Sequence, residues 1–108
     1  MKYEILQIKK ALISTGTWLF MDYEYAKKHD FDIRDYEVVY SGKIAIDKNI
    51  YSVLDDLFIK FNANRPEDFK GHSLSVSDII RLEDGRVFYV DPIGYVPLED
   101  AQWFVTTI

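Results

Sequence analysis

The chain has 108 residues, of which 48% are hydrophobic and 16% aromatic, and its formal net charge is −5. This apolar content argues against disorder and favours one folded domain over residues 1–108. The excess of acids argues against direct nucleic-acid binding, and the absence of cysteine excludes disulfides and thiolate chemistry. No apolar run approaches the roughly 20 residues that span a bilayer, so we expect a cytoplasmic protein without a membrane partner.

Two strands and a short helix are predicted before residue 45. Residues Tyr3–Ile8 are typical of a strand, with Tyr3 and Ile5 on one face and Leu6 and Ile8 on the other. Asp22–His29 is predicted to be a short helix with Asp22 as its N-cap. Tyr36–Ile44 is predicted to be a second strand, bent or bulged at Ser41 and Gly42. One face of that strand would hold Tyr36, Val38 and Tyr40.

The clearest helix extends from about Ile50 to Phe61, because its apolar residues recur at helical spacing. Asp47 or Asn49 is the expected N-cap. The helix should end before Pro66, since the residue that precedes a proline disfavours helical geometry. We expect the apolar stripe to pack into the core: Ile50, Val53, Leu54, Leu57, Phe58 and Phe61.

A hairpin is predicted around the dipeptide Asp84-Gly85, which suits a two-residue type I′ turn. That turn pairs Ile80 with Tyr89 and brings Asp78 opposite Asp91. Two carboxylates directly opposite each other are destabilising, so each needs a partner.

Two interpretations of this aspartate pair remain open. In the first, Asp91 accepts hydrogen bonds from a type I turn over residues 91–94, and Asp78 accepts them from nearby backbone or from Ser75 and Ser77. In the second, the open end of the hairpin holds a metal ion or an acid–base pair.

Three serines precede this hairpin. Ser73, Ser75 and Ser77 alternate with apolar residues, so an extended chain would place their hydroxyls on one face. With His72 and Asp78 or Asp91 they supply the residue types of a hydrolase. However, the sequence has no G-x-S-x-G elbow, and the two histidines, His29 and His72, lack a partner at metal-ligand spacing. We therefore expect the serines to close turns, and we assign no catalytic residue, no metal ligand and no cofactor.

A partner protein could be recognised through acidic and aromatic residues elsewhere in the chain. The segment from residue 31 to residue 37 is acidic, and Trp103 near the C-terminal end either packs on the sheet or remains exposed as an anchor. The candidate interface residues are Asp32, Asp35, Glu99, Asp100 and Trp103.

The sequence NRPEDFKGHSLSVSDIIRL at residues 64–82, followed by FYVDPIGYVPL at residues 88–98, resembles the YodL-like domain family. YEILQIK, DYEVVYSGKI and LDDLFIKFN extend the resemblance over nearly the whole chain. The chain departs from the family at Pro92-Ile93, where a more polar turn is expected, and at Tyr95, where Phe or Trp is expected. The resemblance gives no chemical role to its signature residues: His72, Ser73, Ser75, Ser77, Asp78, Asp91 and Tyr95.

The resemblance implies a non-enzymatic accessory module of Firmicutes and their mobile elements, found beside anti-defence domains and in part linked to actin-like cytoskeletal proteins. We expect an α+β domain with an antiparallel sheet of four to five strands and two to three helices on one face.

The leading functional hypothesis is a counter-defence inhibitor, of anti-restriction or anti-CRISPR type, that binds a host protein as a monomer or weak homodimer. The alternatives are a regulator of an actin-like (MreB-class) protein and a small hydrolase or metal-dependent enzyme that uses His72, Asp78 and Asp91.

Overall fold

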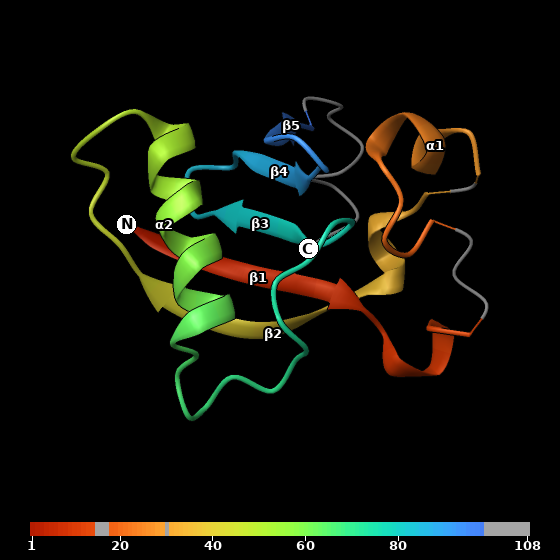
Figure 1. Ribbon diagram of the computed structural model, residues 1–108, viewed down its shortest axis with the longest axis horizontal. Helices are drawn as coiled ribbons and strands as arrows, with labels where there is room; N and C mark the ends of the chain where they lie inside the picture. Colours follow the sequence, from red (N-terminus) through yellow and green to blue (C-terminus); the bar gives the residue numbers. More distant parts are fainter. Residues whose placement is uncertain (15–17, 30, 99–108) are drawn as a thin grey trace.

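The computed structural model describes residues 1–14, 18–29 and 31–98, which form one antiparallel sheet with two α-helices (Figure 1). The sheet has five strands in the order β2-β1-β3-β4-β5. These elements confirm the α+β class and the antiparallel sheet. Their bounds are β1 (Lys2–Ile8), α1 (Tyr23–Lys27), β2 (Tyr36–Lys43), α2 (Ile50–Ala63), β3 (Ile79–Leu82), β4 (Val87–Val90) and β5 (Tyr95–Pro97), with 3₁₀ turns at Lys10–Leu12 and Ile33–Asp35.

Strand β1 contributes buried side chains to both faces of the sheet, as the alternation of its residues predicts. Tyr3 and Ile5 pack into the hydrophobic cluster beneath α2, whereas Leu6 and Ile8 pack into a second cluster on the opposite face. Within the described residues, neither helix is long and apolar enough to cross a membrane.

Helix α2 lies across one face of the sheet (Figure 1). Its predicted stripe is confirmed: Val53, Leu54, Leu57 and Phe61 are buried. Asn49, one of the two predicted caps, accepts a hydrogen bond from the Tyr51 N–H at 2.9 Å. The placement of the helices on one face was wrong in detail, because Ala26 of α1 belongs to the cluster on the opposite face.

Helix α1 is short and begins where the sequence predicts. The Asp22 carboxylate accepts the Tyr25 N–H at 2.7 Å, which confirms the predicted N-cap. The helix lies at one end of the sheet (Figure 1).

A bulge in β2 falls at a different residue from the one predicted. Ile5 pairs with Tyr40 and Leu6 pairs with Val38, so Val39 is the extra residue rather than Ser41 or Gly42. Because one inserted residue reverses the side-chain alternation, Tyr36 packs in one cluster and Tyr40 against the other. The predicted common face of Tyr36, Val38 and Tyr40 was therefore wrong.

The register of the β3–β4 hairpin also differs from the prediction, by one residue. Ile80 pairs with Phe88 rather than with Tyr89. The loop is Glu83–Gly85, with the Gly85 N–H bonded to the Leu82 carbonyl and Gly85 at φ 98°. This is the three-residue hairpin loop, which also needs a glycine in the left-handed region. Asp78 consequently lies opposite Val90, whose N–H bonds to the Asp78 carbonyl at 2.9 Å, and the predicted Asp78–Asp91 pair was wrong.

Removing a buried side chain from α2 should cost far more stability than removing an exposed one. Leu54 is fully buried, so we expect Leu54→Ala to lower the free energy of unfolding by about 2–5 kcal/mol. Ile59 on the same helix is 62% exposed, so Ile59→Ala should change it by less than about 0.5 kcal/mol. Urea denaturation of the two variants tests the prediction, and equal losses would contradict the packing of α2.

Candidate functional site

The segment from Ser73 to Asp78 turns sharply rather than running extended. The Asp78 N–H donates to the Ser75 carbonyl at 3.1 Å, and Ser77 has a φ of 81°. The serine hydroxyls therefore do not share one face, which corrects the expectation from their spacing. Ser75 Oγ donates to the Ser73 carbonyl at 2.8 Å, and Ser77 Oγ accepts the Phe20 N–H at 2.9 Å. The Ser75 bond matches the predicted turn-closing role, whereas Ser77 instead joins the distant segment that contains Phe20.

A buried hydrogen-bond network forms around the Asp78 carboxylate. Asp78 is 1% exposed and Gln7 is 2% exposed. Asp78 Oδ2 accepts Gln7 Nε2–H at 2.9 Å and the Ser75 N–H at 2.8 Å. Gln7 also clamps the main chain of His72, because its Nε2 donates to the carbonyl at 2.9 Å and its Oε1 accepts the N–H at 3.2 Å.

The imidazole of His72 completes this network. Its Nδ1 lies 2.8 Å from the Ser73 carbonyl, and a carbonyl only accepts, so Nδ1 carries the hydrogen. Nε2 then faces Asp78 Oδ1, 4.0 Å away. The structure thus brings together His72, Ser73, Ser75 and Asp78 of the predicted signature, but no bond joins a serine hydroxyl to the imidazole within the described residues.

Burial raises the pKa of the Asp78 carboxyl to about 8, and the hydrogen bonds from Ser75 and Gln7 only partly oppose the shift. The neighbouring Tyr36 also has a raised pKa because it is buried. Its hydroxyl donates to the Ser77 carbonyl at 2.5 Å and accepts Trp18 Nε1–H at 3.1 Å. This end of the site is therefore fixed by two side chains, Trp18 and Tyr36, and by the main chain of Ser77.

Phe20 covers the site from the outside. It has a φ of 65°, which is strained for a bulky residue. Its ring meets the His72 ring edge-to-face with centroids 5.9 Å apart, yet Phe20 is 56% exposed. The strained Phe20 and the strained Ser77 are joined directly by the hydrogen bond between them. Residues held in such conformations cluster at functional sites.

A hollow of about 370 Å³ opens beside His72. It is lined by Gln7, Ile8, Lys10, Ile13, Glu37, Val39, Lys70, Gly71 and His72. Gly71 is needed there, because a Cβ on it would lie 2.0 Å from Gln7 Oε1. No cluster of three or more potential metal ligands occurs among the residues that the structure describes.

Asp91 and Tyr95 lie outside the hydrogen-bond network around Asp78. Asp91 Oδ1 accepts the N–H of Tyr23 at the start of α1, at 2.9 Å, rather than a hydrogen bond from its own turn as predicted. The Tyr95 hydroxyl donates to Asp55 of α2 at 2.8 Å. Asp91 and Tyr95 line a small hollow with Asp55, and His72 and Asp78 are not among its lining residues.

The candidate acidic interface is described only in part. Asp32 caps the 3₁₀ turn at Arg34 N–H and forms an ion pair with the Arg34 guanidinium at 2.6 Å. That bonding lowers the pKa of Asp32. Asp35 ends the same turn, and its carbonyl accepts the Lys9 N–H. Glu99, Asp100 and Trp103 lie outside the described residues.

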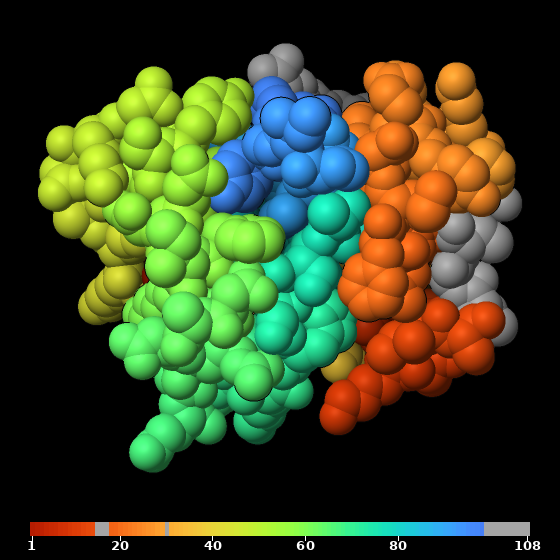
Figure 2. All heavy atoms as spheres, viewed as in Figure 1, coloured from red at the N-terminus to blue at the C-terminus, as the bar shows by residue number. Residues whose placement is uncertain are grey.

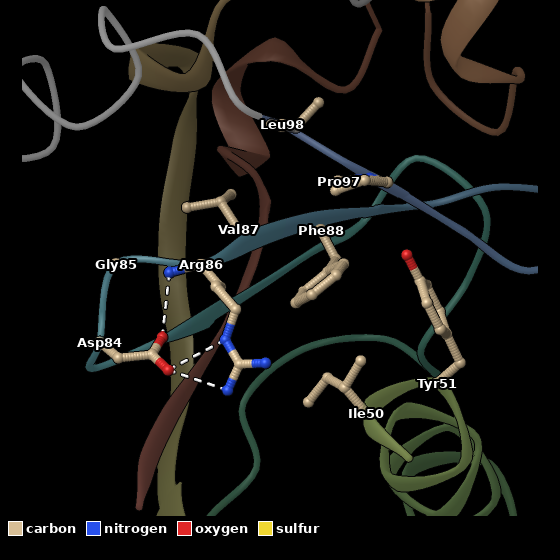
Figure 3. A pocket seen from close by; sticks show the side chains of 9 residues that line it. All are labelled: Ile50, Tyr51, Asp84, Gly85, Arg86, Val87, Phe88, Pro97 and Leu98. Atoms are coloured by element: carbon tan, nitrogen blue, oxygen red, sulfur yellow. Dashed lines mark hydrogen bonds and ion pairs between the residues drawn. The ribbon is translucent and has the colours of Figure 1, made fainter.

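A larger hollow of about 660 Å³ lies between the start of α2 and the β3–β4 hairpin (Figure 3). Phe88, Ile50 and Tyr51 form its apolar wall, and Arg86 lies at its rim in an ion pair with Asp84 at 2.8 Å. The charges at its rim are thus already matched.

Two residues of the site were missed from the sequence. Gln7 follows Tyr3 and Ile5 on the apolar side of β1, and a polar residue at such a position must find buried partners, so a sequence signal existed. The sequence carried no signal for Phe20, because a left-handed backbone conformation at a phenylalanine cannot be foreseen from the residue type.

The raised pKa of Asp78 predicts stability that depends on pH. The folded state holds the Asp78 proton more tightly than the unfolded state, whose pKa is about 3.9. Stability should therefore fall as pH rises from about 4 to about 8. Asp78→Asn retains an acceptor for Gln7 and Ser75 without the charge, so it should remove this dependence and stabilise the protein most at pH 8.

Urea denaturation at several pH values measures this effect. The exposed Glu67→Gln serves as the control. Parallel pH curves for the wild type and Asp78→Asn would contradict a buried carboxyl that favours its protonated form.

Comparison with known proteins gives one finding about family. The family model for the YodL-like domain matches residues 2–100. No curated protein and no solved structure matches the chain. The match extends from β1 through β5 and includes Gln7, Phe20, His72 and Asp78. The chain therefore belongs to the YodL-like domain family.

Proposed function

We propose that this chain is a non-enzymatic protein-binding module that contacts its partner through Phe20, Met21 and Ile93, here called the Phe20 surface. Their exposed fractions are 56%, 39% and 93%. Hydrogen bonds hold the segments that carry these residues. The Tyr89 hydroxyl donates to the Met21 carbonyl, and the Tyr23 N–H donates to the Asp91 carboxylate. Figure 2 displays the segment around Phe20 (orange) and the 91–94 turn (blue) on the face that carries α2 (green).

The exposed, strained ring of Phe20 is the observation that carries the proposal. A positive φ at a bulky residue costs about 1–3 kcal/mol, and the ring recovers little by burial because more than half of the residue is exposed. Exposed aromatic rings held rigidly in place are typical anchors of protein interfaces. Binding is therefore the role that accounts for the strain.

The hydrogen bonds of the serines favour binding over hydrolysis. Ser75 Oγ and Ser77 Oγ are both bonded to the main chain, and Ser77 is fully buried. A serine nucleophile instead needs its hydroxyl bonded to a base.

Acidic residues border the Phe20 surface and suggest a basic partner. Asp22 follows Met21 in the chain, and Asp91 is the first residue of the 91–94 turn and lines a hollow together with Asp55. Carboxylates at the rim of an interface steer a basic partner to it, and salt screens that attraction.

Two partner classes are proposed on the basis of the family. The first is a host defence enzyme, such as a restriction or CRISPR nuclease, which the module would inhibit by occupying its surface. The second is an actin-like cytoskeletal protein. A basic nucleic-acid-binding face of a nuclease suits the acidic border better, so counter-defence is the leading proposal.

Replacing Phe20 should separate binding from stability. Phe20→Gly removes the ring but suits the positive φ, so we expect the melting temperature to stay near the wild-type value while partner affinity falls more than tenfold, as for a binding hot spot. Val38→Ala, at an exposed residue of β2, should leave affinity unchanged. Calorimetry with the identified partner measures both. Unchanged affinity of Phe20→Gly would overturn the Phe20 surface.

The class of partner can be tested by affinity capture from host lysate with wild type and Phe20→Gly, washed at low and high salt. We expect a defence nuclease that wild type retains at low salt and loses at high salt, and that Phe20→Gly does not retain. An actin-like protein with that dependence on Phe20 would instead support the cytoskeletal role. A stable complex that is insensitive to salt would contradict the acidic contribution.

A further inference from the structure

The outer edge of β2 has a row of backbone groups available for another strand. The Ile44 N–H donates to the Met1 carbonyl, so alternation along the ladder directs Gly42 toward β1 and directs Ser41 and Lys43 outward. The Val39 carbonyl also points outward, because it accepts the Lys70 N–H at 3.5 Å. Apart from that long bond, no backbone bond engages this edge within the described chain.

Two lysines lie next to this edge with like charges directly opposite. Lys2 of β1 pairs with Lys43 of β2 in the sheet register, and both side chains are exposed. Neither lysine forms an ion pair with any of the described residues. Like charges directly opposite destabilise a sheet, so an acidic ligand would relieve the repulsion between Lys2 and Lys43.

A hollow of about 550 Å³ lies beside the lysine pair, and it is lined by residues from β1, β2 and the end of β3. Of its two acids, Glu4 forms an ion pair with Arg81 at 2.7 Å, whereas Glu83 accepts the Lys2 N–H at 2.8 Å and keeps its charge. Lys2 and Lys43 together outweigh the charge of Glu83, so this lining favours a carboxylate ligand although the whole chain has a net charge of −5.

We propose that this edge binds an extended acidic segment of another protein, which adds as a strand beside Ser41 and Lys43 and places carboxylates on Lys2 and Lys43. Backbone hydrogen bonds would supply affinity and the lysines would supply specificity, as in other cases of strand addition. A second copy of this chain fits less well, because Lys43 would approach further positive charge at the same edge. The proposal stands independently of the Phe20 surface, because the two lie at opposite ends of the sheet (Figure 1).

The test uses a blocked peptide of alternating glutamate and threonine, as long as the eight residues of β2. Hydrogen exchange followed by NMR should show new protection of the Ser41 and Lys43 amides but no change at Gly42, which already faces β1. A peptide of the same composition with an N-methylated backbone should not bind. Binding without protection of these two amides, or equal binding of the N-methylated peptide, would overturn strand addition, as would absence of binding.

Substitution of Lys43 separates recognition from a structural role. Lys43→Glu replaces a like-charge pair with an opposite-charge pair, so the melting temperature should rise while peptide affinity falls roughly tenfold or more. Two control variants, Lys60→Gln at an exposed position of α2 and Phe20→Gly, should both retain wild-type peptide affinity. If Lys43→Glu binds the peptide as the wild type does, the lysine pair has no part in recognition and the proposal fails.

Discussion

The hydrogen bond between Gln7 and Asp78 is the interaction on which the rest of the site depends. It joins the end of β1 to the residue just before β3, although 71 positions separate the two in sequence. The remaining atoms of the Gln7 amide hold the main chain of His72. No buried side-chain polar atom among the described residues lacks a partner. A network satisfied in this way fixes one arrangement of its segments.

The exposed conformation of Phe20 depends on this hydrogen-bond network. Asp78 holds the turn that contains Ser77, and Ser77 holds Phe20 in its strained conformation. The buried polar residues and the exposed ring therefore form one connected unit. The buried Asp78 carboxyl faces inward, whereas the Phe20 ring faces solvent.

The sequence predicted those elements whose pattern is local. The apolar stripe of α2, the cap at Asp22 and the two faces of β1 all depend on residues within a few positions of each other. The β3–β4 register was not accessible in this way, because Gly85 suits a two-residue and a three-residue loop equally. The choice between them depends on which face of β4 packs beneath α2, and that is a long-range property. The bulge at Val39 also depends on long-range packing, because it places Tyr36 and Tyr40 in clusters on opposite faces of the sheet.

The order of strands in the sheet has a consequence for synthesis of the chain on the ribosome. Tyr3 of β1 pairs with Leu82 of β3, so β1 is made early but cannot complete its second ladder until β3 has emerged. The β1–β2 pair can form first, and until β3 arrives it leaves the unpaired side of β1 open to other nascent chains. Slow translation of the intervening residues would lengthen that interval. The yield of folded protein should therefore be governed by chaperone supply and translation speed as well as by native-state stability.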